Sequence, residues 1–255
     1  MPERPERIVS IRQPAYLPGI VYFDQLLQAD AHAIYDNVQY ERRHYGNRNR
    51  IRSASHPNGW QWLTVPVTTK GQRDQWYMDT RIDNSRHWAQ DHWKAILLNY
   101  ARAPYFQRYA DFFEDLYCQE WTNLADLDTA IIRFLNKQLG VKTKIVLASQ
   151  LKTGTSFEDK NQRLIEIAKE LGATTYVTVK GTSSYIDPEK FREANLTLLW
   201  HQFTHPVYSQ FQGDFIPGMS VVDLLMNCGP DSGEIIRANM QKPTPTFQDH
   251  SPVTP

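Results

Sequence analysis

The stretch IVSIRQPAYLPGIVYF, residues 8–23, decides how the predicted fold begins. Ile8 to Ile11 are an apolar run typical of a short buried strand, and Pro14 and Pro18 turn the chain into a stiff loop. Apolar residues at helical spacing follow over Val21–Ala29, and His32–Tyr35 again has strand character. A strand, helix and strand of this length predict two parallel strands joined by a crossover helix.

The same alternation returns in the second half of the chain. Strands are predicted at Lys144–Ala148, Thr174–Val179 and Leu196–Phe203, with a helix from Asp159 to the stop at Gly172 between the first two. Trp60–Val67 is a further predicted strand, and its Pro66 places it at a sheet edge or at its own end. We therefore expect an α/β fold: an open, mostly parallel, Rossmann-like sheet with helices on both faces.

Residues 85–140 depart from this alternation and predict a helical insertion. Ser85 is the expected N-cap of a first helix, Pro104 opens a second, and a third runs from Leu124 to Leu139. The interpretation is one α/β domain over residues 1–241, with this helical subdomain and a disordered Pro/Thr-rich tail at 242–255. Ser220 and Asp223 predict a capping box for a late helix that ends at Gly229-Pro230.

Composition excludes several classes of protein. Lys and Arg total 28 and Asp and Glu total 28, which excludes nucleic-acid binding driven by the charge of the whole chain. No apolar run approaches the length of a membrane helix, and the start of the chain is unlike a signal peptide. Two cysteines are too few for a disulfide framework. We expect a cytoplasmic protein without a membrane partner, and the oligomeric state stays open.

Polar side chains follow the first two predicted strands. In an open α/β sheet, ligands bind at the carboxyl ends of strands. Gln13, in the first loop with Tyr16, could offer its amide to an anionic or carbonyl oxygen, and Asp36 is a candidate general base followed by Gln39. The alternatives are a proline-rich connection without a ligand and an Asp that only caps a loop.

A basic cluster lies just beyond. Guanidinium groups and interleaved amides suit phosphate or carboxylate. Its members are Arg42, Arg43, His44, Asn47, Arg48, Asn49, Arg50 and Arg52. The alternative is an exposed loop. The glycines of a phosphate-binding loop or a dinucleotide fingerprint are missing, so no cofactor is expected.

Two later strand ends also carry candidate ligand-binding residues. Lys180 and Ser183 belong to a small hydroxyl-rich turn that could approach a ligand closely, or be an ordinary connection. His205, at another strand end, is a candidate general base, with Tyr208 and Gln210 following it; the alternative is a structural histidine.

Metal and thiol chemistry are disfavoured. His201 and His205 have the spacing of a helical metal pair, but they lie in a predicted strand and its following loop, so no metal site is expected. Cys228 ends a predicted helix, where the negative end of the dipole disfavours a thiolate nucleophile.

Several ordered blocks resemble the WbqC-like protein family. They are Gln13–Pro18, Asp36–Gln39, Asn47–Ile51, Trp62–Val67, Leu171–Tyr176, His205–Gln210 and Ser220–Leu224. Arg12 stands where the family frequently has His, so a role for that His does not carry over. The resemblance implies a protein encoded with surface-polysaccharide genes that transfers glycine or another acyl group to an amino sugar.

Together these observations predict an aminoacyl or acyl transferase acting on an amine acceptor, such as an amino sugar or a small metabolite. Arg48 and Arg50 would hold a phosphate or carboxylate of the substrate, facing His205 across one hollow, while His205 or Asp36 takes the proton and Gln13 stabilises the oxyanion. An aminoacyl-tRNA, held by the local basic patch, would explain why no ATP motif is present. The alternatives are a nucleotidyl-transferring or adenylating enzyme of the same fold class and a non-catalytic sugar-nucleotide-binding protein.

Overall fold

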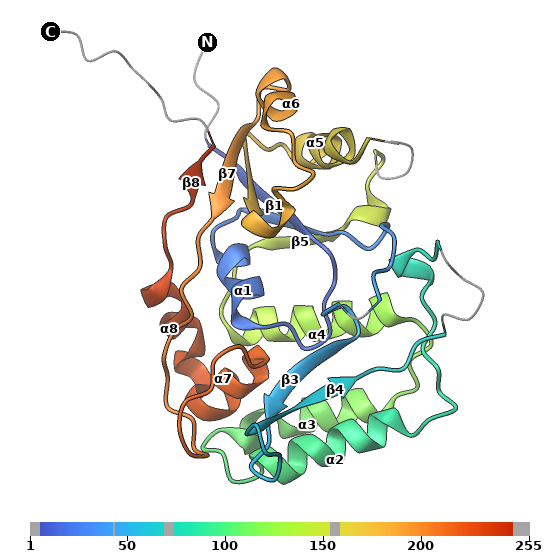
Figure 1. Ribbon diagram of the computed structural model, residues 1–255, viewed down its shortest axis with the longest axis vertical. Helices are drawn as coiled ribbons and strands as arrows, with labels where there is room; N and C mark the ends of the chain where they lie inside the picture. Colours follow the sequence, from blue (N-terminus) through green and yellow to red (C-terminus); the bar gives the residue numbers. More distant parts are fainter. Residues whose placement is uncertain (1–5, 43, 69–73, 154–158, 247–255) are drawn as a thin grey trace, which may run out of the picture.

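One sheet of six strands, in the order β5-β2-β1-β6-β7-β8, organises the molecule (Figure 1). The computed structural model describes residues 6–42, 44–68, 74–153 and 159–246. The strands are β1 (Ile8–Arg12), β2 (Ala31–Ile34), β5 (Lys144–Leu147), β6 (Thr175–Val179), β7 (Thr197–His201) and β8 (Thr244–Pro245). The first five pair in parallel and β8 is antiparallel to β7, which confirms the mostly parallel sheet.

Helices cover both faces of this sheet, as predicted (Figure 1). α1 (Ile20–Leu27), α4 (Leu124–Gln138), α7 (Val221–Cys228) and α8 (Ser232–Asn239) contribute to one apolar core. α5 (Lys160–Glu170) and α6 (Pro188–Glu193) contribute to the other. The helices that follow β1, β2 and β7 lie on one face, and those that follow β5 and β6 lie on the other. Because β1 and β6 are neighbours in the sheet, the change of face between them creates the cleft described below.

The helical insertion consists of α2 (Trp88–Tyr100), α3 (Phe106–Cys118) and α4. Two of its predicted starts are wrong. The N-cap of α2 is His87, because the Ser85 hydroxyl donates to the Asp83 carboxylate at 2.6 Å. Pro104 precedes the N-cap of α3, Tyr105, and so stays outside the first turn.

β3 (Arg48–Arg52) and β4 (Trp60–Thr64) form a separate antiparallel pair. The strand predicted at 60–67 therefore exists, but it ends before Pro66 and lies outside the main sheet. Its partner strand, β3, comes from the segment that the sequence predicts only as a basic cluster. Ile51 and Leu63 from this pair are buried in the core, so the alternate residues, including the arginines, occupy the opposite face.

Three further predictions about chain ends and caps can be compared with the structure. Asp159 and Ser220 are N-caps, accepting from the backbone N–H of Asn161 and Val222. The carboxylate of Asp223 instead binds tyrosine hydroxyls, so the capping box is wrong. The tail predicted to be disordered contributes β8 to the sheet, and residues 247–255 lie outside the described residues.

Two buried histidines should make the protein acid-sensitive. Burial lowers the pKa of His32 to about 3 and that of His92 to about 4, and the His92 ring contacts the Tyr16 hydroxyl at 2.7 Å. An unfolded histidine has a pKa of about 6.5. Between these pKa values the unfolded chain binds more protons, so the free energy of unfolding falls as the pH drops. At pH 4.5 each histidine should reduce that free energy by about 2–3 kcal/mol relative to pH 7.

Urea unfolding of the wild type and of His92→Gln at the two pH values measures this effect. The variant removes one titrating group while keeping a polar side chain beside Tyr16. We expect its loss of stability between pH 7 and pH 4.5 to be smaller by about 2–3 kcal/mol. An identical pH dependence in both proteins would show that His92 does not titrate as described.

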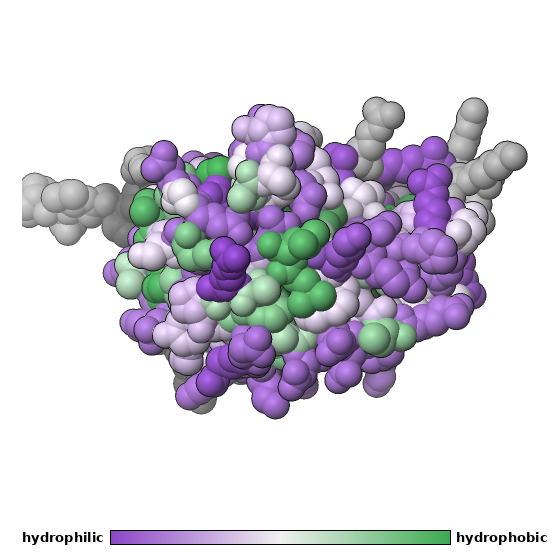
Figure 2. All heavy atoms as spheres, turned by 90° about the horizontal axis from the view of Figure 1, so that it is seen from below, coloured by the Kyte–Doolittle hydropathy of each residue, from purple (hydrophilic) through white to green (hydrophobic). Residues whose placement is uncertain are grey.

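No described helix is long and apolar enough to cross a bilayer. The face seen from below is mostly hydrophilic around a small apolar patch (Figure 2). α2 lies at this end of the molecule and carries the exposed side chains of Leu97 and Leu98 (Figure 1). Neither side chain lines the cavities described next.

Candidate functional site

A cavity opens where β1 and β6 end side by side. From β1 the chain continues to α1 on one face, and from β6 it continues to α6 on the other. Such a switch point is where open α/β sheets bind ligands. This strand-end cavity has a volume of about 400 Å³, within the range of small-molecule sites.

The wall of the strand-end cavity combines cations, aromatic rings and a few acids. Arg163 of α5 is buried with its guanidinium over the rings of Tyr35 and Trp76, at 5.1 and 5.2 Å, and donates to the Asn37 carbonyl. The wall residues are Ile11, Arg12, Gln13, Gln25, Tyr35, Val38, Gln39, Glu41, Asp74, Trp76, Lys160, Arg163, Leu164, Tyr176, Thr178, Val179, Thr182 and Tyr185. Three cations against two acids favour an anionic ligand in contact with a ring.

A second cavity lies on the other side of the first loop. This loop cavity has a volume of about 240 Å³ and is lined by the loop, the first turn of α1, the β3 arginine face and residues 203–219. Arg12 and Gln13 line both cavities. The Gln13 side-chain amide makes no hydrogen bond within the described part of the chain. Two pockets therefore meet at one guanidinium and one amide.

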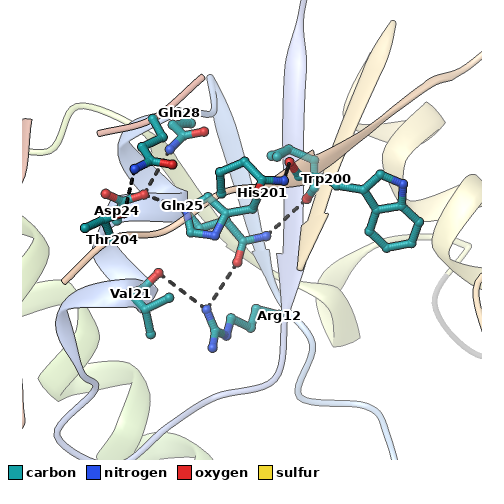
Figure 3. A network of polar contacts seen from close by, with 11 residues as sticks. Arg12, Val21, Asp24, Gln25, Gln28, Trp200, His201 and Thr204 are labelled. Carbon is teal, nitrogen blue, oxygen red and sulfur yellow. Dashed lines mark hydrogen bonds and ion pairs between the residues drawn. The ribbon is translucent and has the colours of Figure 1, made fainter. Parts of the chain in front are cut away.

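Arg12 is held at this junction by neutral groups (Figure 3). One nitrogen, Nη1, makes both of its hydrogen bonds, to the Val21 carbonyl at 3.5 Å and to Gln25 Oε1 at 3.3 Å. Its guanidinium also lies 5.3 Å from the centre of the Tyr22 ring. Burial lowers the pKa of Arg12. Across the described ranges, no carboxylate lies within ion-pair distance of this arginine.

The acid next to Gln25 on α1 is engaged elsewhere. Asp24 is buried, and its Oδ1 contacts His201 Nε2 at 2.5 Å and accepts from Gln28 Nε2 at 2.9 Å (Figure 3). His201, at the end of β7, is thus a buried structural partner of α1. Its pairing with a carboxylate leaves it no part in a metal site with His205.

The first loop is rigid because two neighbouring segments hold it. Leu17 adopts a left-handed backbone (φ 43°), which is uncommon for a branched residue. Asn49 Nδ2 donates to its carbonyl at 2.7 Å, and the Val221 N–H donates to the Pro18 carbonyl at 2.9 Å. Backbone kept in such a conformation by its surroundings is common at ligand sites.

Arg50 and His205 line the same loop cavity, and one glycine connects them. Arg50 Nη2 donates to the Gly218 carbonyl at 2.9 Å, while the Gly218 N–H donates to His205 Nε2 at 3.0 Å. The other ring nitrogen of His205 is 2.8 Å from the Pro206 carbonyl. Both nitrogens are therefore occupied by backbone, so this histidine holds the loop in place and is poorly arranged to accept a proton.

Arginines and tryptophans alternate on the outer face of β3 and β4. Arg48 lies 4.6 Å from the Trp62 ring centre, and Arg50 lies 4.9 Å from that of Trp60. Trp62 and Tyr45 are partly exposed, with ring centres 6.0 Å apart, and Tyr45 lines the mouth of the loop cavity. This Arg–Trp face gives the rim of the cavity a surface on which flat rings can stack. Arg43 lies outside the described residues.

Of the predicted catalytic residues, Gln13 and His205 line a cavity, and of the predicted substrate-binding residues, Gln39, Asn49 and Arg50 do. Asp36 does not, because its carboxylate accepts from the Ser149 N–H at 2.9 Å and from the Ser149 hydroxyl, so it caps the neighbouring strand end. Predicted substrate-binding residues that line neither cavity are Tyr16, Asn47, Arg48, Lys180, Ser183, Tyr208 and Gln210.

Four of these side chains are either buried in the core or exposed to solvent away from the cavities. The Tyr16 hydroxyl contacts His92 and Tyr117 in the core, and Asn47 donates to the Val65 carbonyl. Lys180 and Ser183 are exposed on the turn after β6. These four side chains do not face either cavity.

Tyr208 and Gln210 serve a buried carboxylate. Both donate to Asp223 Oδ2 at 2.7 Å, and the Tyr100 hydroxyl donates to Oδ1 at 2.8 Å. Burial raises the pKa of Asp223. These hydrogen bonds join α2, α7 and the loop that carries His205, so Asp223 stabilises the position of that loop.

Neither Cys118 nor Cys228 lines either cavity. Burial raises the pKa of Cys228 to about 11, which agrees with the argument against a thiolate nucleophile. No group of three or more potential metal ligands occurs within the described ranges.

Sequence reasoning missed the cations that matter most here. Arg12 was noted only as a departure from a family pattern, although its place at a strand end was a usable signal. Arg163 and Lys160 lie on a helix about 120 residues beyond the loops they face, and nothing local marks them as ligand-binding.

The fold defines an open α/β protein with a candidate ligand site at the switch point of its sheet. The chain belongs to the WbqC-like protein family, whose model matches residues 13–235. It is similar to an uncharacterized protein of Mycobacterium tuberculosis (strain ATCC 25618 / H37Rv), with 34% identity over 231 residues, covering 90% of this chain and 97% of that protein. No solved structure matches the chain.

Proposed function

We propose that this protein is a transferase that moves an aminoacyl or other acyl group, such as glycyl, from an activated donor to an amine acceptor. The observation that supports a two-substrate reaction is the pair of cavities with a shared wall at Arg12 and Gln13. A transfer enzyme must bring two ligands together at one point. In this proposal the acceptor occupies the strand-end cavity and the acyl end of the donor occupies the loop cavity.

The strand-end cavity fits a phosphate- or carboxylate-bearing acceptor, such as a nucleotide-linked amino sugar. Arg12, Lys160 and Arg163 would balance the negative charge, and Trp76 and Tyr185 offer ring surfaces. Glu41 and Asp74 on the same wall suit the amine. Such an acceptor would suit a role in surface-polysaccharide or specialised-metabolite biosynthesis.

The transfer needs no oxidant or cofactor. The acceptor nitrogen attacks the acyl carbonyl, a C–N bond forms, and the C–O bond to the donor alcohol breaks. The proton released by the amine passes to the leaving alkoxide. The Gln13 amide, which the described residues leave without a protein partner, would donate to the oxyanion that develops on the carbonyl oxygen.

The Arg–Trp face supports an RNA-linked donor. Tyr45 lines the loop cavity, Trp62 lies beside Tyr45, and Arg48 lies over Trp62, so nucleobases could stack on this face beside the acyl group. An aminoacyl-tRNA, available in the cytoplasm, would supply an already activated ester. The charge balance of the chain restricts such contact to this local face.

Mass spectrometry of the acceptor tests the proposal. Purified protein is incubated with a nucleotide-linked amino sugar and either mixed aminoacyl-tRNA, deacylated tRNA or acyl-CoA thioesters. With aminoacyl-tRNA, we expect the acceptor to gain the mass of one aminoacyl residue. With deacylated tRNA, we expect its mass to stay unchanged. An acceptor that binds but never gains mass with any donor would favour a non-catalytic binding protein. Pyrophosphate release from ATP would favour the nucleotidyl-transferring alternative.

A further inference from the structure

We propose that Arg12 forms an oxyanion-binding site at the junction of the two cavities, which takes one phosphate or carboxylate group of a bound substrate. The occupant rests on the proposed function, since we assign this group to the acceptor. The site itself rests only on the surroundings of Arg12.

The groups that contact Arg12 directly are neutral. Arg12 donates to the Val21 carbonyl at 3.5 Å and to the Gln25 side-chain oxygen at 3.3 Å, and both hydrogen bonds are long. The aromatic ring beside its guanidinium is that of Tyr22. Nε and Nη2 make no hydrogen bond to the described residues. Even a partly buried cation is less stable without an anion nearby. The arrangement is therefore incomplete until an anion arrives.

The geometry also keeps Arg12 ready for such a ligand. Gln25 accepts from Arg12 with its oxygen (Figure 3). With its nitrogen it donates to the Val177 carbonyl of β6, at 3.1 Å. This bridge ties the guanidinium across β1 and β6. The nearest acid along the helix, Asp24, is held by His201 and Gln28 and does not neutralise it.

A planar guanidinium with two uncommitted nitrogens suits an oxyanion, because a fork of N–H donors can bind two oxygens at once. Phosphate and carboxylate share this chemistry. Because Arg12 lines both cavities, the bound group would lie beside the point where the acyl group is transferred.

Isothermal titration calorimetry with inorganic phosphate and with acetate, at constant ionic strength, tests the site. The full-length wild type, Arg12→Gln, Arg12→Lys and the exposed control Arg102→Gln are compared. We expect saturable binding to the wild type and the control, at least tenfold weaker binding to Arg12→Gln, and partial retention in Arg12→Lys. If the wild type binds phosphate more tightly than acetate, the substrate group in this site is a phosphoryl group. If it binds acetate more tightly, that group is a carboxylate.

Two further readouts separate binding from a structural role. Without ligand, Arg12→Gln should melt at the same temperature as the wild type or higher, because an uncompensated buried charge is removed. Arg12→His should bind the anion at pH 5.5 and lose it at pH 8, as the imidazole loses its charge. A strongly destabilised Arg12→Gln, or anion binding that does not depend on residue 12, overturns the proposal. Anion binding without acyl transfer would leave this site standing and refute the proposed reaction.

Discussion

Replacing Asp223 by alanine should lower the free energy of unfolding by about 3–5 kcal/mol, a fall of about 10 °C in Tm. The substitution leaves three donors, from Tyr100, Tyr208 and Gln210, without their shared acceptor in a buried region. Each unsatisfied buried donor costs about 1–3 kcal/mol. Thermal and urea unfolding followed by circular dichroism measures the loss.

Asp231→Ala is the matched control, because this aspartate is exposed at the start of α8 and caps nothing with its side chain. It should change the free energy of unfolding by less than about 1 kcal/mol. Asp223→Asn, which keeps one acceptor oxygen, should fall between the wild type and Asp223→Ala. A loss below about 1 kcal/mol in Asp223→Ala would mean that the tyrosines find other partners and that this carboxylate does not support the site.

Replacing Gln13 by alanine should reduce kcat of the proposed transfer by about 10²–10³-fold. The reason is that its amide lies at the shared wall of both cavities, where the oxyanion would form. Stability should change little, because this side chain makes no hydrogen bond within the described ranges. The rate of acceptor acylation at saturating donor measures the effect.

Gln107→Ala, on the exposed face of α3, should leave the rate unchanged. Gln13→Glu should be at least as slow as Gln13→Ala, since a carboxylate repels the developing negative charge. If Gln13→Ala raised KM while kcat stayed at the wild-type value, the residue would only bind substrate and the oxyanion would form elsewhere.

The alternation of strands and helices was predictable because each parallel strand of the main sheet is a local apolar run. The five parallel strands and the insertion carry this signal within a few residues of themselves. β3 does not, since Arg48–Arg52 has Asn49 and Ile51 on one face and three arginines, of which Arg52 is buried, on the other. β3 is a strand because it pairs with β4, which begins 12 residues after β3 begins.

The site was less predictable, because polar side chains near strand ends can serve either the ligand or the fold. Asp36 and Tyr208 have the right residue types, but Ser149 and Asp223, distant in sequence, occupy them. Arg12 is a candidate oxyanion-binding residue only because the structure places no carboxylate of the described residues within ion-pair distance of it. The partners of a buried polar group decide its role, and those partners are set by tertiary structure.

The most direct test is a crystal structure of the protein with a nucleotide-linked amino sugar and a non-hydrolysable 3′-aminoacylamide of adenosine. The account predicts the amino sugar in the strand-end cavity and the acyl group in the loop cavity. Amine and carbonyl would then meet beside Arg12 and Gln13. Both ligands in one cavity, or either bound away from these two residues, would contradict it.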